Sequence, residues 1–102
     1  MGKCRITVIR KLACVDLKEE YFDREITGDG TCGYFNVGDE FIYSTGDDVP
    51  ENFCAWAWSD INRDVEAIAN GANFDWIKQP GTNITCCTDG LEPVVFKIER
   101  IE

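Results

Sequence analysis

The stretch from Asn83 to Ile101, NITCCTDGLEPVVFKIERI, predicts two strands joined by a tight connection. Apolar and charged residues alternate over residues 94–101, which is the pattern of a strand with one buried face. A shorter strand is expected over residues 83–87. Between them, Asp89-Gly90 is a strong hairpin-turn signal, and Pro93 removes one backbone donor from the pairing.

Two further strands are expected upstream of this hairpin. Residues 4–14 alternate with period two, and residues 40–43 follow a turn centred on Gly38. The strands nearest the two chain ends are the longest and most regular, so they are expected to be central. The result is a small, mainly antiparallel sheet, which could be open or curled toward a barrel-like shape.

Two helices complete the predicted fold. The main helix is expected over residues 59–70, where apolar residues recur at helical spacing, with Ser59 as its N-cap and Gly71 as the residue that ends it. A short helix is expected over residues 16–22, capped by Asp16. Its inward side chains would be Leu17 and Tyr21. The predicted class is therefore α+β, in one domain spanning residues 1–102.

The chain is acidic, with 19 acidic and 10 basic residues and a formal net charge of −9. Nucleic acid and anionic membrane surfaces would repel such a chain. No apolar run approaches the roughly 20 residues that span a bilayer. Neither nucleic acid nor a membrane is expected as a partner, which leaves a protein partner or a second copy of this chain.

The cysteine content indicates a reducing compartment. Six cysteines occur without a paired C-x-x-C spacing, and no secretory signal core precedes them. We therefore expect free thiols and a cytoplasmic location. Histidine is absent, which removes the commonest general base and the usual mixed Cys/His zinc site.

Four cysteines are candidate ligands. Cys32 and Cys54 lie on predicted loops, and Cys86-Cys87 precede the hairpin turn. Together they could bind zinc or an iron–sulfur cluster, although the chain places only Cys86-Cys87 close together. If Ile84 faces the core, alternation places Cys86 there too and turns Cys87 outward, beside the backbone amides near Asp89.

The tryptophans offer a second kind of site. Aromatic residues at this density usually form the core of a small domain. Trp56 could instead supply an aromatic wall for a flat ligand, provided that Trp58 turns inward. The candidate ligand-binding residues are therefore as follows: Cys32, Cys54, Trp56, Cys87 and Asp89.

Several segments together resemble a known family. They run from Phe53 to Ile61 (FCAWAWSDI), from Gly71 to Trp76 (GANFDW) and from Cys86 to Ile101 (CCTDGLEPVVFKIERI). In these the chain resembles a family of uncharacterised small proteins from anaerobic bacteria and archaea. The resemblance implies that Cys32, Cys54 and Cys86-Cys87 occupy family motif positions.

The chain departs from the family pattern at two positions. Gly33 stands where members have proline, and Glu92 stands where they have arginine. The family has no established activity, so the resemblance implies no reaction.

Two functional interpretations follow from these residues. The chain is a small cytoplasmic non-catalytic binding or accessory domain, or it is a thiol-based metal or redox module that uses Cys32, Cys54 and Cys86/Cys87. An enzyme ranks lowest, because no recognisable nucleophile or acid–base set is present.

Overall fold

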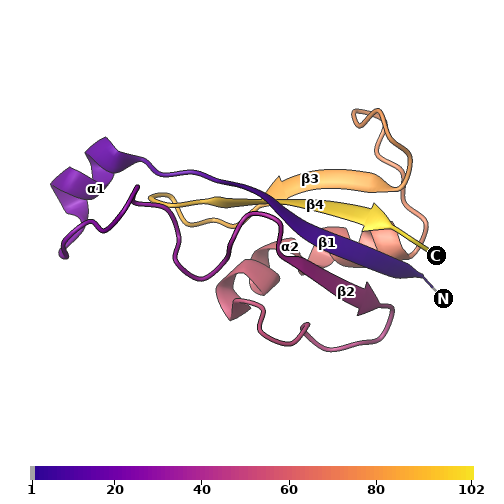
Figure 1. Cartoon of the computed structure of the whole chain (residues 1–102). Coiled ribbons are helices and arrows are strands. Elements are labelled where there is room, and N and C mark those ends of the chain that lie inside the picture. Colours follow the sequence, from indigo (N-terminus) through magenta and orange to yellow (C-terminus); the bar gives the residue numbers. More distant parts are fainter. Residues whose placement is uncertain (1) are drawn as a thin grey trace.

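The computed structural model describes residues 2–102 and shows an α+β fold (Figure 1). Its elements in chain order are β1 (Lys3–Lys11), α1 (Val15–Tyr21), β2 (Glu40–Ser44), α2 (Ala55–Ala69), β3 (Thr82–Cys86) and β4 (Val94–Arg100). The four strands form one antiparallel sheet in the order β2-β1-β4-β3. The predicted fold class is confirmed, but the sheet is open, so the barrel-like version is wrong.

The strands near the two chain ends are central in the sheet, as predicted. β1 pairs with β4 from Cys4 opposite Arg100 to Lys11 opposite Val94, with one irregularity between Val8 and Arg10. Beyond the end of β1, the Leu12 N–H still donates to the Pro93 carbonyl at 2.9 Å. β1 ends at Lys11 and not at the predicted residue 14. The backbone after it still runs alongside the connection between β3 and β4.

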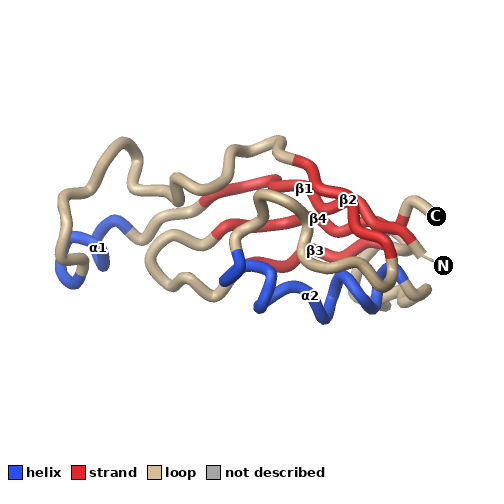
Figure 2. The backbone as a smooth tube through the Cα atoms, turned by 90° about the horizontal axis from the view of Figure 1, so that it is seen from below, coloured by secondary structure: helices blue, strands red, loops and turns tan. Residues whose placement is uncertain are grey.

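One face of the sheet is covered by α2 (Figure 2). The inward side chains of β1 and β4 meet the buried side of α2 and form the core. Its largest fully buried strand and helix residues are Ile6, Val8, Tyr43, Ile61, Val65, Ile68, Val94, Phe96 and Ile98. Within residues 2–102, no helix covers the opposite face of the sheet (Figure 2). Ile42 and Ile84 are exposed, whereas their chain neighbours Tyr43 and Asn83 are buried, so alternation places both isoleucines on that face.

Helix α2 begins four residues before the predicted start, so the assignment of Ser59 as N-cap is wrong. Cys54 has extended backbone angles, and its carbonyl accepts the first helical hydrogen bond from the Trp58 N–H at 2.9 Å. Trp58 extends the helix because its ring packs on Tyr43 and Phe53, a tertiary contact that outweighs weak local propensity.

The end of α2 follows the prediction. Gly71 has a φ of 102°, and its N–H donates to the Ile68 carbonyl at 3.2 Å. The Ala72 N–H donates to the Ala67 carbonyl at 3.0 Å. These two bonds form a Schellman motif, in which glycine supplies the left-handed residue without steric strain.

Helix α1 lies at the far end of the molecule, whose extents are 45 × 29 × 20 Å (Figure 1). The predicted inward residues Leu17 and Tyr21 are exposed, so that orientation is wrong. Cys14, not Asp16, is at the N-cap, and the buried side chain of this helix is Lys18. Its ammonium group has polar partners nearby, which fixes the face that α1 presents inward.

Candidate functional site

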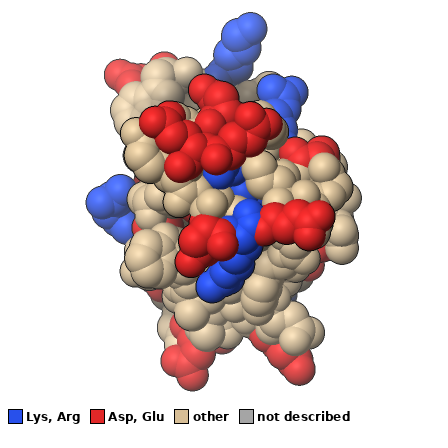
Figure 3. Space-filling model, turned by 90° about the vertical axis from the view of Figure 1, so that its left-hand side faces the viewer, with Lys and Arg blue, Asp and Glu red and all other residues tan. Residues whose placement is uncertain are grey.

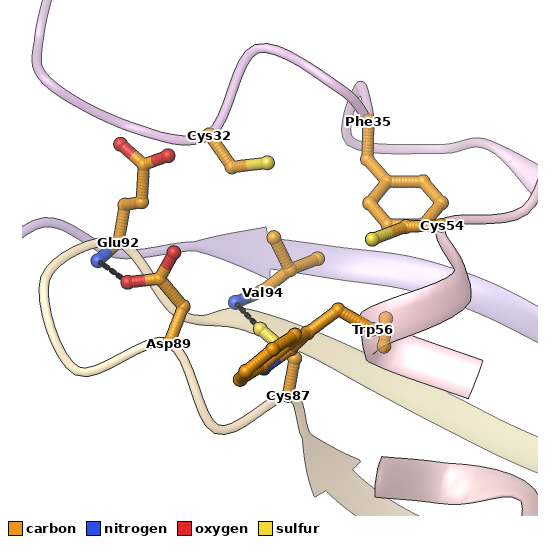
Figure 4. A pocket seen from close by; sticks show the side chains of 9 residues that line it. Cys32, Phe35, Cys54, Trp56, Cys87, Asp89, Glu92 and Val94 are labelled. Carbon is orange, nitrogen blue, oxygen red and sulfur yellow. Dashed lines mark hydrogen bonds between the residues drawn. The ribbon is translucent and has the colours of Figure 1, made fainter. Parts of the chain in front are cut away.

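A small cavity opens between α2 and the β3–β4 connection (Figure 4). Its volume is about 80 Å³. Four segments line it: the connection before β2, the start of α2, the β3–β4 connection and the first residue of β4. The lining residues are Cys32, Phe35, Cys54, Trp56, Ala57, Cys87, Asp89, Glu92 and Val94.

All five candidate ligand-binding residues lie around this one cavity: Cys32, Cys54, Trp56, Cys87 and Asp89. They come from segments up to 57 positions apart in the chain (89 minus 32). That they bind a ligand stays a prediction. Cys86, the remaining candidate thiol, is exposed and does not line the cavity.

The predicted orientations of the cysteine pair are reversed. Cys87 is buried with 8% exposure, whereas Cys86 shares the outer face with Ile84, which is 45% exposed. Asn83 takes the inward position that Ile84 was expected to hold, with 6% exposure. The period of two is correct, but the face that meets the helix is the other one.

Backbone hydrogen bonds hold two of the thiols. The Val94 N–H donates to Cys87 Sγ at 3.4 Å (Figure 4). The Tyr34 N–H donates to Cys32 Sγ at 3.4 Å. Cys54 stands at the N-cap of α2 and makes no capping hydrogen bond with its side chain. The three thiols therefore lie around the cavity in different settings.

Asp89 forms the turn that the sequence predicts. Its Oδ1 accepts hydrogen bonds from the N–H groups of Leu91 at 2.9 Å and Glu92 at 3.1 Å. Side chains that bond backbone groups two and three residues ahead stabilise tight turns. This carboxylate is therefore a structural part of the cavity rim.

A second set of contacts ties the β3–β4 connection to α2. Trp56 Nε1 donates to Thr88 Oγ1 at 3.1 Å, and the Thr88 N–H donates to Asp60 Oδ2 at 2.8 Å. Trp56 is nevertheless 68% exposed, while Trp58 packs against the core as the aromatic-wall hypothesis requires. The indole of Trp56 thus stands at the cavity edge, with its N–H already bonded.

Two lysines that do not line the cavity hold its lining segments in place by hydrogen bonds. Lys18 Nζ donates to Glu92 Oε2 at 2.6 Å and to the Gly30 carbonyl at 2.9 Å. Lys11 Nζ donates to the carbonyls of Cys32 and Phe35, both at 2.9 Å. Acidic side chains gather on this end of the molecule around a strip of basic ones (Figure 3).

Four lining residues were not among the sequence candidates: Phe35, Ala57, Glu92 and Val94. Ala57 follows Cys54 by one helical turn, so a correct helix start would have placed both on one side. For Glu92, the sequence offered only a difference from the family that the chain resembles. Phe35 lies in an irregular connection, where no periodicity indicates which side chains turn inward.

The candidate metal ligands do not form a metal centre as they stand. Across residues 2–102, no group of three or more cysteine, aspartate or glutamate side chains lies close enough together to hold a metal ion. All six cysteines are free. In the same part of the chain, no helix is both long and apolar enough to cross a membrane.

Comparison of the chain with protein-family models, with curated proteins and with solved structures finds no match. The cavity and its chemistry are therefore the basis for assigning a function.

Proposed function

We propose that this chain is a non-catalytic binding domain of the cytoplasm that receives one small apolar side chain from a basic protein partner. The observation that carries the proposal is the convergence of Cys32, Cys54, Trp56 and Cys87 around one cavity. Six free thiols are consistent with a reducing compartment.

The size and lining of the cavity favour a short apolar group. A volume of about 80 Å³ holds several waters, since one water needs roughly 10–15 Å³. It is smaller than the roughly 150 Å³ of an apolar cavity that takes benzene. Phe35, Ala57 and Val94 supply apolar surface, and neutral thiols behave as small polarizable hydrophobes.

The surroundings of the cavity favour a positively charged partner. Asp89 and Glu92 line its rim, and Asp16, Glu19 and Glu20 are exposed on α1, whose Lys18 binds Glu92. A basic surface would be attracted to this end of a chain with net charge −9. The exposed side chains of Leu17 and Tyr21 add apolar contact area beside these acids.

A binding role also agrees with what the cavity residues already do. The Asp89 carboxylate accepts two backbone hydrogen bonds, and the Trp56 indole N–H donates to Thr88. The chain has no histidine to act as a base for the thiols. These groups hold the walls of the cavity in place, as recognition of a side chain requires.

The test uses capped tripeptides and backbone amide NMR. The peptide acetyl-Lys-Leu-Lys-amide should shift the amides of Cys32, Cys54, Trp56 and Cys87, and a matched peptide with glutamates in place of the lysines should not. Cys54→Phe, which fills the cavity from its edge, should abolish these shifts. Cys86→Phe, which changes a thiol outside the cavity, should leave them intact.

Two results would refute this function. One is that no amide around the cavity responds to the lysine peptide in the folded wild-type protein. The other is that Cys54→Phe and Cys86→Phe bind the peptide equally well.

The alternative is a thiol-based metal or redox module, with zinc or an iron–sulfur cluster as the bound group. It is favoured by three of the four candidate thiols lining one cavity, although they would have to move closer together to share an ion. Elemental analysis and an absorption spectrum of anoxically purified protein distinguish the two. Metal that is lost on Cys32→Ser would support the alternative.

The family resemblance belongs to the same proposal. The segments that carry it include Cys54, Trp56, Cys87 and Asp89, which all line the cavity. If the proposal holds, proteins of that family use this cavity too, and members with arginine in place of Glu92 would prefer partners of different charge.

A further inference from the structure

We infer a second binding site, separate from the thiol-lined cavity, for a small planar aromatic molecule that carries a negative charge. The site is a groove of about 480 Å³ between the connection that follows α2 and the strands β3 and β4. It shares no residue with the thiol-lined cavity. Its lining residues are Trp76, Ile77, Lys78, Gln79, Thr82, Ile84, Lys97 and Glu99.

The apolar part of the groove is a supported aromatic platform. Trp76 is 70% exposed, and its ring stacks on Phe74 with centroids 4.9 Å apart and planes 22° apart. Phe74 in turn packs against the hydrophobic core, so the indole is held from below. Ile84, exposed on the uncovered sheet face, extends the apolar surface beside it.

An exposed indole on a fixed support is suited to stacking. Since Phe74 covers one part of Trp76 and most of the indole is still open, a flat ring can pack on the remainder. Stacking on aromatic side chains accepts many planar rings, because each has a π-face. The volume of the groove lies in the range of sites for small molecules.

The charged part of the groove is basic, which is unusual in this acidic chain. Lys97 lies 3.6 Å from Glu99, but Glu99 is also 3.7 Å from Arg5, so one carboxylate is shared by two cations. Lys78 is exposed and forms no ion pair within residues 2–102. Among the residues that line the groove, two lysines and one carboxylate give a net charge of +1, and Arg5 beside Glu99 adds a further cation. The neighbouring acid Asp75 does not line the groove.

The Trp76 indole beside the ammonium groups of Lys78 and Lys97 indicates a ligand that has both a flat ring and a negative charge. A nucleoside monophosphate and an aryl carboxylate share this chemistry, a flat ring with an anionic group a short distance from it. The amide of Gln79 and the hydroxyl of Thr82 add neutral hydrogen-bonding groups to the same groove.

The test titrates the whole chain with four probes and follows backbone amide shifts. The probes are adenosine monophosphate, adenosine, indole-3-acetate and inorganic phosphate. Either or both of the two charged aromatic probes should bind, at least about tenfold more tightly than adenosine or phosphate alone. Binding of only the nucleotide or only the carboxylate identifies the source of the anionic group.

Matched variants locate the site. Trp76→Ala should weaken binding by about tenfold or more, whereas Trp56→Ala, at an equally exposed tryptophan of the other cavity, should not. Lys97→Met should weaken binding, while Lys3→Met, which removes a lysine of similar exposure from its own ion pair with Glu102, should not.

The inference is wrong if neither charged aromatic probe shifts the amides of residues 76–79. It is equally wrong if the Trp76 and Trp56 variants lose affinity to the same extent, or if adenosine binds as tightly as its monophosphate and indole-3-acetate does not bind.

Discussion

Cys4 shows what the core does to a single ionisable group. Its side chain is fully buried, and the thiol donates to the Val65 carbonyl at 3.6 Å. Burial raises the pKa of Cys4 from 9.0 to about 11, with Arg100 lowering it and Glu66 raising it to smaller extents. The thiol is therefore neutral throughout the neutral pH range and serves as a core residue.

This shift predicts a loss of stability in alkali. The unfolded thiol loses its proton near pH 9 and the folded one near pH 11, so the contribution of Cys4 is complete below pH 9 and declines as pH rises toward 11. In Cys4→Val the decrease in urea midpoint from about pH 8 to about pH 10 should be smaller than in wild type.

Cys86→Val is the matched control, because its thiol is exposed. It should retain the wild-type decrease in urea midpoint, and other titrating groups cancel in the comparison. Equal decreases in wild type and Cys4→Val would contradict the prediction.

Among the elements, α1 depends on the polar contacts of Lys18, which binds the Glu92 carboxylate and the Gly30 carbonyl. With seven residues it is too short to be stable alone. Its link to the rest of the chain runs through Lys18, whose side chain is 5% exposed and whose ammonium lies 2.6 Å from Glu92. A buried cation needs such a partner.

Glu92→Gln should therefore loosen α1 without unfolding the sheet. The substitution leaves the Lys18 ammonium without its charged partner, at a cost of about 2 kcal/mol. Amide hydrogen exchange should accelerate in α1 and stay unchanged in α2. The comparison variant is Glu102→Gln, which breaks an exposed pair with Lys3 and should change neither helix. Unchanged protection in α1 would rule out this role for Lys18.

Across the whole molecule, an irregular connection supplies part of the core. Phe35 lies between α1 and β2, yet it is 2% exposed. Its ring packs edge-on against Phe53 at 5.1 Å and Phe96 at 5.3 Å, so it joins two connections to a central strand. It also lines the thiol-lined cavity, which couples that cavity to global stability.

Phe35→Ala is expected to destabilise the whole domain by about 3–5 kcal/mol, because it removes a buried ring from a packed core. The free energy of unfolding, measured with urea, should fall by that amount. Tyr34→Ala changes the neighbouring ring, which is 55% exposed, and should stay within about 0.5 kcal/mol of wild type. Similar effects of the two substitutions would show that Phe35 is not a core residue.

Local patterns were sufficient for much of the fold. The alternating pattern predicted β1 and β4, and their length and regularity predicted that they are central in the sheet. Gly71 correctly predicted the end of α2. The start of α2 was missed because its N-cap residue, Cys54, makes no side-chain capping hydrogen bond, and because Trp58 packs on Tyr43, which is distant in the chain. The face of α1 was missed because a lysine, and not an apolar residue, is buried there.

For the thiol-lined cavity too, some features followed from the sequence and others only from the tertiary structure. The amino-acid sequence by itself determined the α+β class, the residue types of the candidate site and the opposite orientations of Cys86 and Cys87. Only the tertiary structure decided that Cys87 is the inward member and that it lines one cavity with Cys32 and Cys54. The physical reason is that a period of two relates neighbouring side chains to each other, whereas packing against α2 selects the face that becomes the core.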